Sequence, residues 1–190
     1  TTSTSGCCAT RWTAARAGPW WTPASAATAR AQWEQVFANE LDGLPVLRVI
    51  VTHMHPDHIG LAQWLCERWS TPDHECRLWI SGMDYTMARI GSQSTTGFGG
   101  DSAAAFFRLH GLTDPDSLEK IRARAAYYPS LVPGVPGRFR RLLDGQTVTI
   151  GGRGWRCIAG YGHAPEHIAL SCDELQVLIS GDMVLPLSLI

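Results

Sequence analysis

Thr52-His53-Met54-His55-Pro56-Asp57-His58 carries more information about this chain than any other stretch of it. An apolar, β-branched run at residues 46–51 precedes the stretch and predicts a buried strand. An amphipathic pattern at 59–69 predicts that a helix follows. The segment could be a His-rich turn capped by Asp57, but three imidazoles and a carboxylate within six residues favour a metal site.

The spacing of these residues suggests how they would be shared between ions. Just after a strand, residues two apart point the same way, so His53 and His55 can bind one ion. The turn at Pro56 redirects the chain, which lets Asp57 and His58 face a second ion beside the first.

Two further groups of ligand-type residues also follow predicted strands. A strand predicted at 155–159 leads to Gly160-Tyr161-Gly162-His163, and one at 176–179 leads to Ser180-Gly181-Asp182. Further strands are predicted at 78–80, 147–150 and 168–171. Strand ends are where an α/β architecture gathers its functional groups, so the three motifs are expected to converge.

The remaining segments predict one domain from residue 32 to 190. Residues 31–41 have helical spacing, and residues 82–137 form a mostly helical insert, interrupted at Gly97-Phe98-Gly99-Gly100 and irregular from 129 to 137. Arg138, Arg140 and Arg141 are interpreted as a solvated strand face in preference to an anion site. His74 and His110 have no partner motif and are interpreted as background residues.

Composition excludes some classes of function. The formal net charge is −1, which gives no support for nucleic-acid binding. No apolar run approaches the ~18 residues that span a bilayer, and no signal-peptide pattern is present. The six cysteines are dispersed as in a protein with free thiols, which predicts a cytoplasmic location.

Residues 1–31 do not match this pattern. They contain no Val, Ile, Leu, Met, Phe, Asp or Glu, and no strand or amphipathic helix can be patterned from them. Three Trp nevertheless lie there, which a disordered tail would not favour. The codons of Trp20-Trp21-Thr22, shifted by two bases, force Val-Asp. The hypothesis is that roughly residues 1–30 are an out-of-frame translation of a β-hairpin.

At this point the three motifs identify a family resemblance. Residues 52–58 resemble the T-H-x-H-x-D-H signature of the metallo-β-lactamase superfamily. Gly162-His163-Ala164-Pro165-Glu166-His167 resembles its second motif, often G-H-T-P-G-H in glyoxalase II-like members, and Ser180-Gly181-Asp182 resembles its third. The resemblance implies an α/β (α+β) fold, a four-layer αββα sandwich.

The resemblance also implies roles for the motif residues. His53, His55 and His163 would bind the first metal, Asp57 and His58 the second, and Asp182 both; His167 would orient its loop without binding metal. The ions would be one or two Zn²⁺, with Fe or Mn as alternatives. Asp182 stands where the best-known zinc β-lactamases carry Cys, and His55 where flavodiiron proteins carry Glu, which disfavours both activities.

Two expected features are missing. The family has another His well downstream of the third motif, whereas this chain stops at Ile190, and its N-terminal Asp-Thr-Gly hairpin appears only in the hypothetical shifted frame. The chain is therefore expected to be a sandwich that is incomplete at both ends.

The resemblance implies a metal-dependent hydrolase acting on a small molecule. A metal-bound hydroxide would attack a thioester or ester carbonyl, as in glyoxalase II-like enzymes, with Asp57 as the catalytic proton shuttle. The alternatives are a sulfur dioxygenase with a single iron, a transfer-RNA-processing nuclease, which the near-neutral charge opposes, and an inactive fragment lacking the last ligand.

Overall fold

The computed structural model describes residues 23–94 and 99–184. The first described element is helix α1, Pro23–Glu40, which begins eight residues before the predicted helix. Apolar periodicity did not predict a helix in residues 23–30, because this part of α1 has no apolar stripe. This segment is rich in Ala, the strongest helix former, and its first residue, Pro23, suits the first turn. Residues 1–22, and with them most of the frame-shift hypothesis, lie outside the described residues.

A three-stranded parallel sheet lies at the centre of the molecule. Its strands are β1 (Arg48–Ile50), β2 (Arg77–Ser81) and β3 (Phe139–Leu142), in the order β1-β2-β3. One face packs against helices: Val49, Leu78 and Ile80 are buried in a cluster that also contains residues of α1. The opposite face, with Leu142, joins a second cluster. The arginines of β3 are exposed, as predicted for a solvated strand face.

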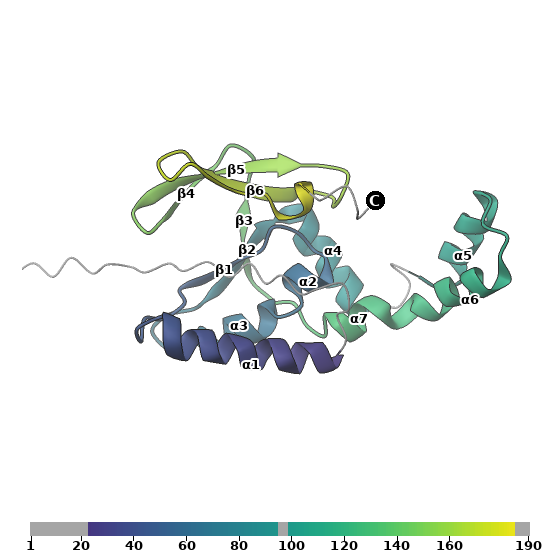
Figure 1. The fold of residues 1–190 in the computed structure, drawn as a ribbon, viewed down its shortest axis with the longest axis horizontal. Helices are drawn as coiled ribbons and strands as arrows, with labels where there is room; N and C mark the ends of the chain where they lie inside the picture. Colours follow the sequence, from purple (N-terminus) through teal and green to yellow (C-terminus); the bar gives the residue numbers. More distant parts are fainter. Residues whose placement is uncertain (1–22, 95–98, 185–190) are drawn as a thin grey trace, which may run out of the picture.

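A four-stranded antiparallel sheet packs over that second face (Figure 1). Its strands follow one another along the chain: β4 (Thr147–Ile150), β5 (Arg153–Gly160), β6 (His167–Cys172) and β7 (Val177–Ile179). Apolar residues of alternate positions, including Val148, Trp155 and Leu170, form the core between the sheets. The strands predicted from alternation match the observed ones to within two residues at each end.

The helices that follow α1 connect the strands of the parallel sheet to one another. α2 (Pro56–Ile59) and α3 (Ala62–Trp69) replace the single helix predicted at 59–69, since the backbone of Leu61 leaves the helical region. The insert contains α4 (Gly82–Gln93), α5 (Gly100–Leu109), α6 (Pro115–Ala123), the short 3₁₀ turn η1 (Arg124–Ala126) and α7 (Tyr127–Leu131). α5 and α6 project away from the sheets (Figure 1). A 3₁₀ turn, η2 (Gly181–Met183), follows β7.

The predicted pair of sheets with helices outside is confirmed. Within the described residues the helices lie on the side of the parallel sheet (Figure 1). Three of the four expected layers are therefore present in this part of the chain. Among the described helices, none is both long and apolar enough to cross a membrane.

Candidate metal centre

The two sheets meet where their ligand-type residues lie. After β1, the backbone N–H of Val51 donates to the carbonyl of Trp79 in β2 (2.9 Å). One residue later, the carbonyl of Thr52 accepts from the N–H of Ile168 in β6 (2.8 Å). This crossing hydrogen bond brings the end of the parallel sheet against the start of β6. The residues that follow Thr52 therefore lie beside the loop between β5 and β6.

Three histidine nitrogens converge at this junction. Nε2 of His53 lies 3.0 Å from Nδ1 of His55, which lies 3.0 Å from Nε2 of His163, and the third side of the triangle is 3.2 Å. A ring nitrogen carries either a proton or a lone pair, so three mutual contacts cannot all pair a donor with an acceptor. At least one pair must therefore consist of two donors or two acceptors. A cation bound by the lone pairs of all three nitrogens would remove this mismatch.

The triangle also has the right size for one ion. Two ligands at Zn–N distances near 2.0–2.1 Å and tetrahedral angles lie roughly 3.3–3.4 Å apart. The observed separations are slightly shorter, and these three atoms form one of two groups with metal-ligand geometry in the described residues. His53 is buried and His163 is exposed, so the group opens to solvent on one side. Such a group could hold a divalent ion with an open coordination position.

Asp182 lies beside this triangle and belongs to the second group of potential ligands, which consists of His53, His58 and Asp182 and does not include Asp57. Its Oδ2 is 3.4 Å from Nε2 of His163 and 4.0 Å from Nε2 of His53. Its Oδ1 is 3.3 Å from Nε2 of His58, which in turn lies 3.5 Å from Oδ2 of Asp57. The carboxylate of Asp182 thus presents one oxygen to each side, as a bridge between two ions would require. The turn η2 positions it, immediately after β7.

Burial keeps imidazoles of this cluster neutral. The pKa of His53 lies far below its ordinary value, because burial disfavours the charged ring and His58 adds repulsion. Burial also lowers the pKa of His55, with the neighbouring His163 as the second cause. Neutral imidazole is the form that binds metal, so the site is prepared for ligation near neutral pH.

The hydroxyl of Thr52 contacts two of the histidine rings on the side away from the proposed ligand atoms. Thr52 Oγ1 lies 3.0 Å from Nδ1 of His53 and 3.4 Å from Nδ1 of His58. A hydroxyl oxygen can accept two hydrogen bonds, so both rings can donate to Thr52 through Nδ1. Each ring then presents the lone pair of Nε2 to the cluster, and Thr52 fixes both tautomers.

His167 contacts the site from another direction. Its Nε2 accepts from the backbone N–H of Asp182 (3.3 Å), and its ring stacks on that of His53. Burial lowers the pKa of His167 to about 4. It belongs to neither ligand group in the described residues. Gly181 has a φ of +52°, and a Cβ there would overlap His167 Nε2 and lie 3.0 Å from Thr52 Oγ1, so only glycine fits.

Asp84, which belongs to none of the three sequence motifs, holds two of the ligand-bearing segments together. This fully buried carboxylate accepts from the N–H of Met54 through Oδ1 (2.8 Å) and from the N–H of Glu166 through Oδ2 (2.7 Å). Met54 lies between His53 and His55, and Glu166 lies between His163 and His167. The Ser81 hydroxyl donates to Oδ2 as well (3.2 Å). One side chain therefore holds the backbone of the first and second motifs in register.

Glu166 makes that attachment reciprocal. Its Oε2 accepts from the N–H of Met83 in α4 (3.0 Å), next to Asp84. Arg141 of β3 lies 3.7 Å from its Oε1. The sequence Ser81-x-x-Asp84 after a strand is a capping signal, which could have placed Asp84 in the first turn of a helix. Nothing local in the sequence indicates its contacts with both metal-motif loops.

The residues interpreted as background lie apart from these groups. His74 is exposed, and its Nε2 contacts the carbonyl of Leu47 (3.0 Å). His110 is exposed at the end of α5. Neither residue belongs to a ligand group among the described residues.

Comparisons with known proteins agree with this architecture. A relative described as "Probable metallo-hydrolase YflN", from Bacillus subtilis, is 27% identical over 149 residues, which cover 76% of this chain and 47% of that protein. A β-lactamase domain protein from Burkholderia ambifaria is 50% identical with a TM-score of 0.71, over 84% of this chain and 43% of the other. TTHA1429 from Thermus thermophilus, a metallo-β-lactamase family protein, is 26% identical with a TM-score of 0.59, over 84% and 48%.

The chain spans about half the length of these relatives. The sequence model of the metallo-β-lactamase superfamily matches residues 17–190, which include all three motifs and nearly the whole chain. The chain therefore belongs to the metallo-β-lactamase superfamily.

Proposed function

We propose that this chain carries the catalytic centre of a metal-dependent hydrolase that acts on a small-molecule thioester or ester. His53, His55 and His163 would bind one divalent ion, and Asp57, His58 and Asp182 would contribute to a second, with Asp182 shared. The observation that carries the proposal is the triangle of three nitrogens, 3.0–3.2 Å apart, beside a carboxylate that faces both groups. Zn²⁺ suits this set of imidazole and carboxylate donors, as Fe or Mn would.

The ions would supply the electrophilic part of the chemistry, by lowering the pKa of water and polarising a carbonyl. The protein residues would orient and exchange protons around them. Asp57 is suited to proton exchange because its carboxylate is 38% exposed while one oxygen remains 3.5 Å from His58 Nε2. Thr52 would hold the tautomers of His53 and His58, and Asp84 the spacing of the two motif loops.

The choice of a thioester or ester depends on the resemblance of the second motif to glyoxalase II-like members. Glu166 occupies a position that is often Gly in that motif, and here it ties the loop to α4. Since the chain spans about half of its relatives, the substrate is a proposal for the whole protein.

The ligand assignment is tested by replacing a histidine inside the proposed metal site and a histidine outside it. His55→Ala should remove metal retention and most hydrolysis, whereas His74→Ala, at an exposed site contacting Leu47, should change neither. Metal content would be measured by elemental mass spectrometry, and turnover with acyl-glutathione thioesters and aryl esters. Equal damage from both variants would contradict the ligand assignment. One iron per chain without hydrolysis would select the dioxygenase alternative.

A further inference from the structure

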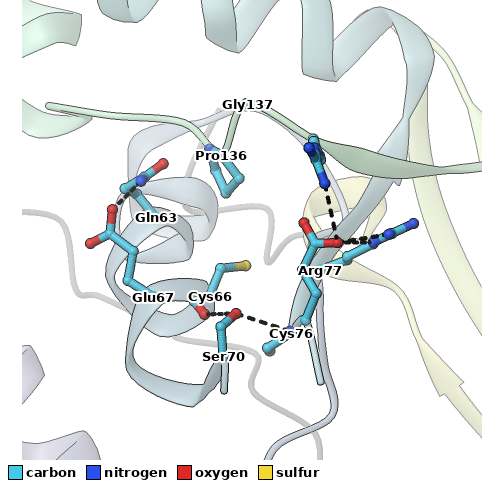
Figure 2. A pocket seen from close by; sticks show the side chains of 10 residues that line it. Gln63, Cys66, Glu67, Ser70, Cys76, Arg77, Pro136 and Gly137 are labelled. Carbon is cyan, nitrogen blue, oxygen red and sulfur yellow. Dashed lines mark hydrogen bonds and ion pairs between the residues drawn. The ribbon is translucent and has the colours of Figure 1, made fainter. Parts of the chain in front are cut away.

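A cavity, drawn in Figure 2, is lined by residues at the starts of strands of the parallel sheet, whereas the metal centre lies at their ends. Its volume is about 530 Å³, and its walls come from α3, the start of β2 and the segment that precedes β3. The metal-motif residues follow the end of β1, whereas Arg77 and Arg138 lie at the starts of β2 and β3. Because these strands are parallel, the cavity and the metal centre are separate sites.

Two cysteines from different elements line this cavity. Cys66 belongs to α3 and Cys76 directly precedes β2; they are 7% and 2% exposed, and both are free thiols. Ser70 ties their backbones together: its hydroxyl donates to the carbonyl of Cys66 (2.7 Å) and accepts from the N–H of Cys76 (3.0 Å). Figure 2 shows this bridge beside the two side chains. The two segments are therefore held close without a covalent link.

The two thiols also influence each other electrostatically, and their pKa values move in opposite directions. Cys66 and Cys76 share a side-chain hydrogen bond, which raises the pKa of the Cys66 thiol and lowers that of Cys76. The thiol with the lowered pKa, Cys76, is therefore taken as the nucleophile of the pair. Two neighbouring thiols beside an opening to solvent, one with a lowered pKa, have the arrangement of a reactive cysteine and its resolving partner.

We propose that Cys66 and Cys76 are an oxidation site, which a hydroperoxide reaching the cavity converts into a disulfide between α3 and the start of β2. The sulfur of Cys76 attacks the peroxide O–O bond, forming a sulfenic acid and releasing water. The sulfur of Cys66 then attacks the sulfenyl sulfur, the S–O bond breaks, and a second water leaves with the Cys66 proton. The cysteine pair loses two electrons and two protons, and hydrogen peroxide is reduced to two waters.

The chain provides its own comparison. Cys157 and Cys172 are as deeply buried, in the core between the sheets, and burial raises the pKa of Cys157 to about 11. Neither Cys157 nor Cys172 lines the cavity. A reaction governed by burial alone would treat both pairs alike. A reaction governed by the cavity and the thiol contact should favour Cys66 and Cys76.

Peptide mapping of the whole chain tests the proposal. Trypsin places Cys66 in residues 49–68 and Cys76 in residues 69–77, while Cys157 and Cys172 share residues 157–190. The reduced protein would be treated with hydrogen peroxide, alkylated with N-ethylmaleimide and digested without reductant. We expect the two short peptides to be recovered joined, lighter by two hydrogens than their sum, while Cys157 and Cys172 remain alkylated.

Variants separate the steps. Cys66→Ser should abolish the joined peptide and leave Cys76 as a sulfenic acid that dimedone traps, whereas Cys172→Ser should leave the joined peptide unchanged. The wild-type map alone remains decisive if a variant does not fold. Persistence of alkylatable Cys66 and Cys76 after peroxide would overturn the proposal. So would equal joining in the guanidinium-unfolded chain, because the folded cavity would then play no part.

Discussion

Asp84→Ala should be among the most damaging substitutions in this chain that touch no proposed ligand. The change removes the acceptor of the N–H groups of Met54 (2.8 Å) and Glu166 (2.7 Å), both held by a fully buried carboxylate. A buried donor left without a partner costs about 1–3 kcal/mol, so the two together cost roughly 2–6 kcal/mol. Native domains are stable by only about 5–15 kcal/mol, so this loss is a large part of the whole.

Asp84→Asn should fall between alanine and the wild type. The amide keeps the shape and one oxygen, but its NH₂ group must face one of the two backbone donors, so about half of the loss is expected. Asp73→Asn, at an exposed position, is the matched control and should be neutral to within about 0.5 kcal/mol. Guanidinium unfolding of the metal-free proteins measures stability, and calorimetric titration with Zn²⁺ measures the first-site affinity.

Stability and zinc affinity should both decrease from wild type to Asn to Ala, because the same carboxylate sets the fold of the loops and the spacing of His55 and His163. An Asp84→Ala protein as stable as Asp73→Asn would refute the assigned role of the carboxylate. Full stability combined with lost zinc affinity would show that Asp84 acts on the metal and not on the loops.

Three further outcomes are expected. Thr52→Val, which removes the acceptor shared by two ring nitrogens, should weaken Zn²⁺ binding roughly 10–100-fold in a calorimetric titration, and Thr52→Ser should restore it. Gly181→Ala should lower the guanidinium midpoint more than Gly43→Ala, because both have positive φ but only Gly181 faces His167; equal losses would exclude the clash. Burial lowers the pKa of His167 to about 4, so the folded state binds fewer protons than the unfolded state below about pH 6.5. The metal-free chain should therefore lose about 1.4 kcal/mol per pH unit from this group as pH falls from about 6.5 to 4, and His167→Gln should flatten that slope in thermal melts.

Sequence patterns predicted the elements whose signal is local. The strands Thr147–Ile150 and His167–Cys172 were predicted to within one residue at each end, because β-branched and apolar residues there alternate or run together. Periodicity was less useful for α1, where an alanine-rich segment forms a helix without an apolar stripe. Periodicity also missed the interruption at Leu61, because the apolar positions on either side remain in register.

For the candidate metal centre, the sequence likewise predicted the ligands but not the residues that support them. Ligand chemistry is visible in the sequence, since imidazoles and carboxylates directly follow strands, and the structure brings His55 and His163 to 3.0 Å although 108 positions separate them. The support around them is not visible. Asp84 acts on Met54 and Glu166, which are 30 and 82 positions away, and no local pattern reports contacts of that length.

The connection of the strands has a consequence for how the chain folds. Every neighbouring pair in the β4-β5-β6-β7 sheet is also adjacent in sequence, whereas β1, β2 and β3 pair only after long helical crossovers. Contacts that close short loops form faster than those that close long ones, so the β4–β7 meander should form before the parallel sheet. His163 and Asp182 belong to the early unit, and His53 and His55 to the late one. The nitrogen triangle therefore forms only when the two sheets pack together. The moment at which the refolding chain begins to bind metal should report when this packing occurs.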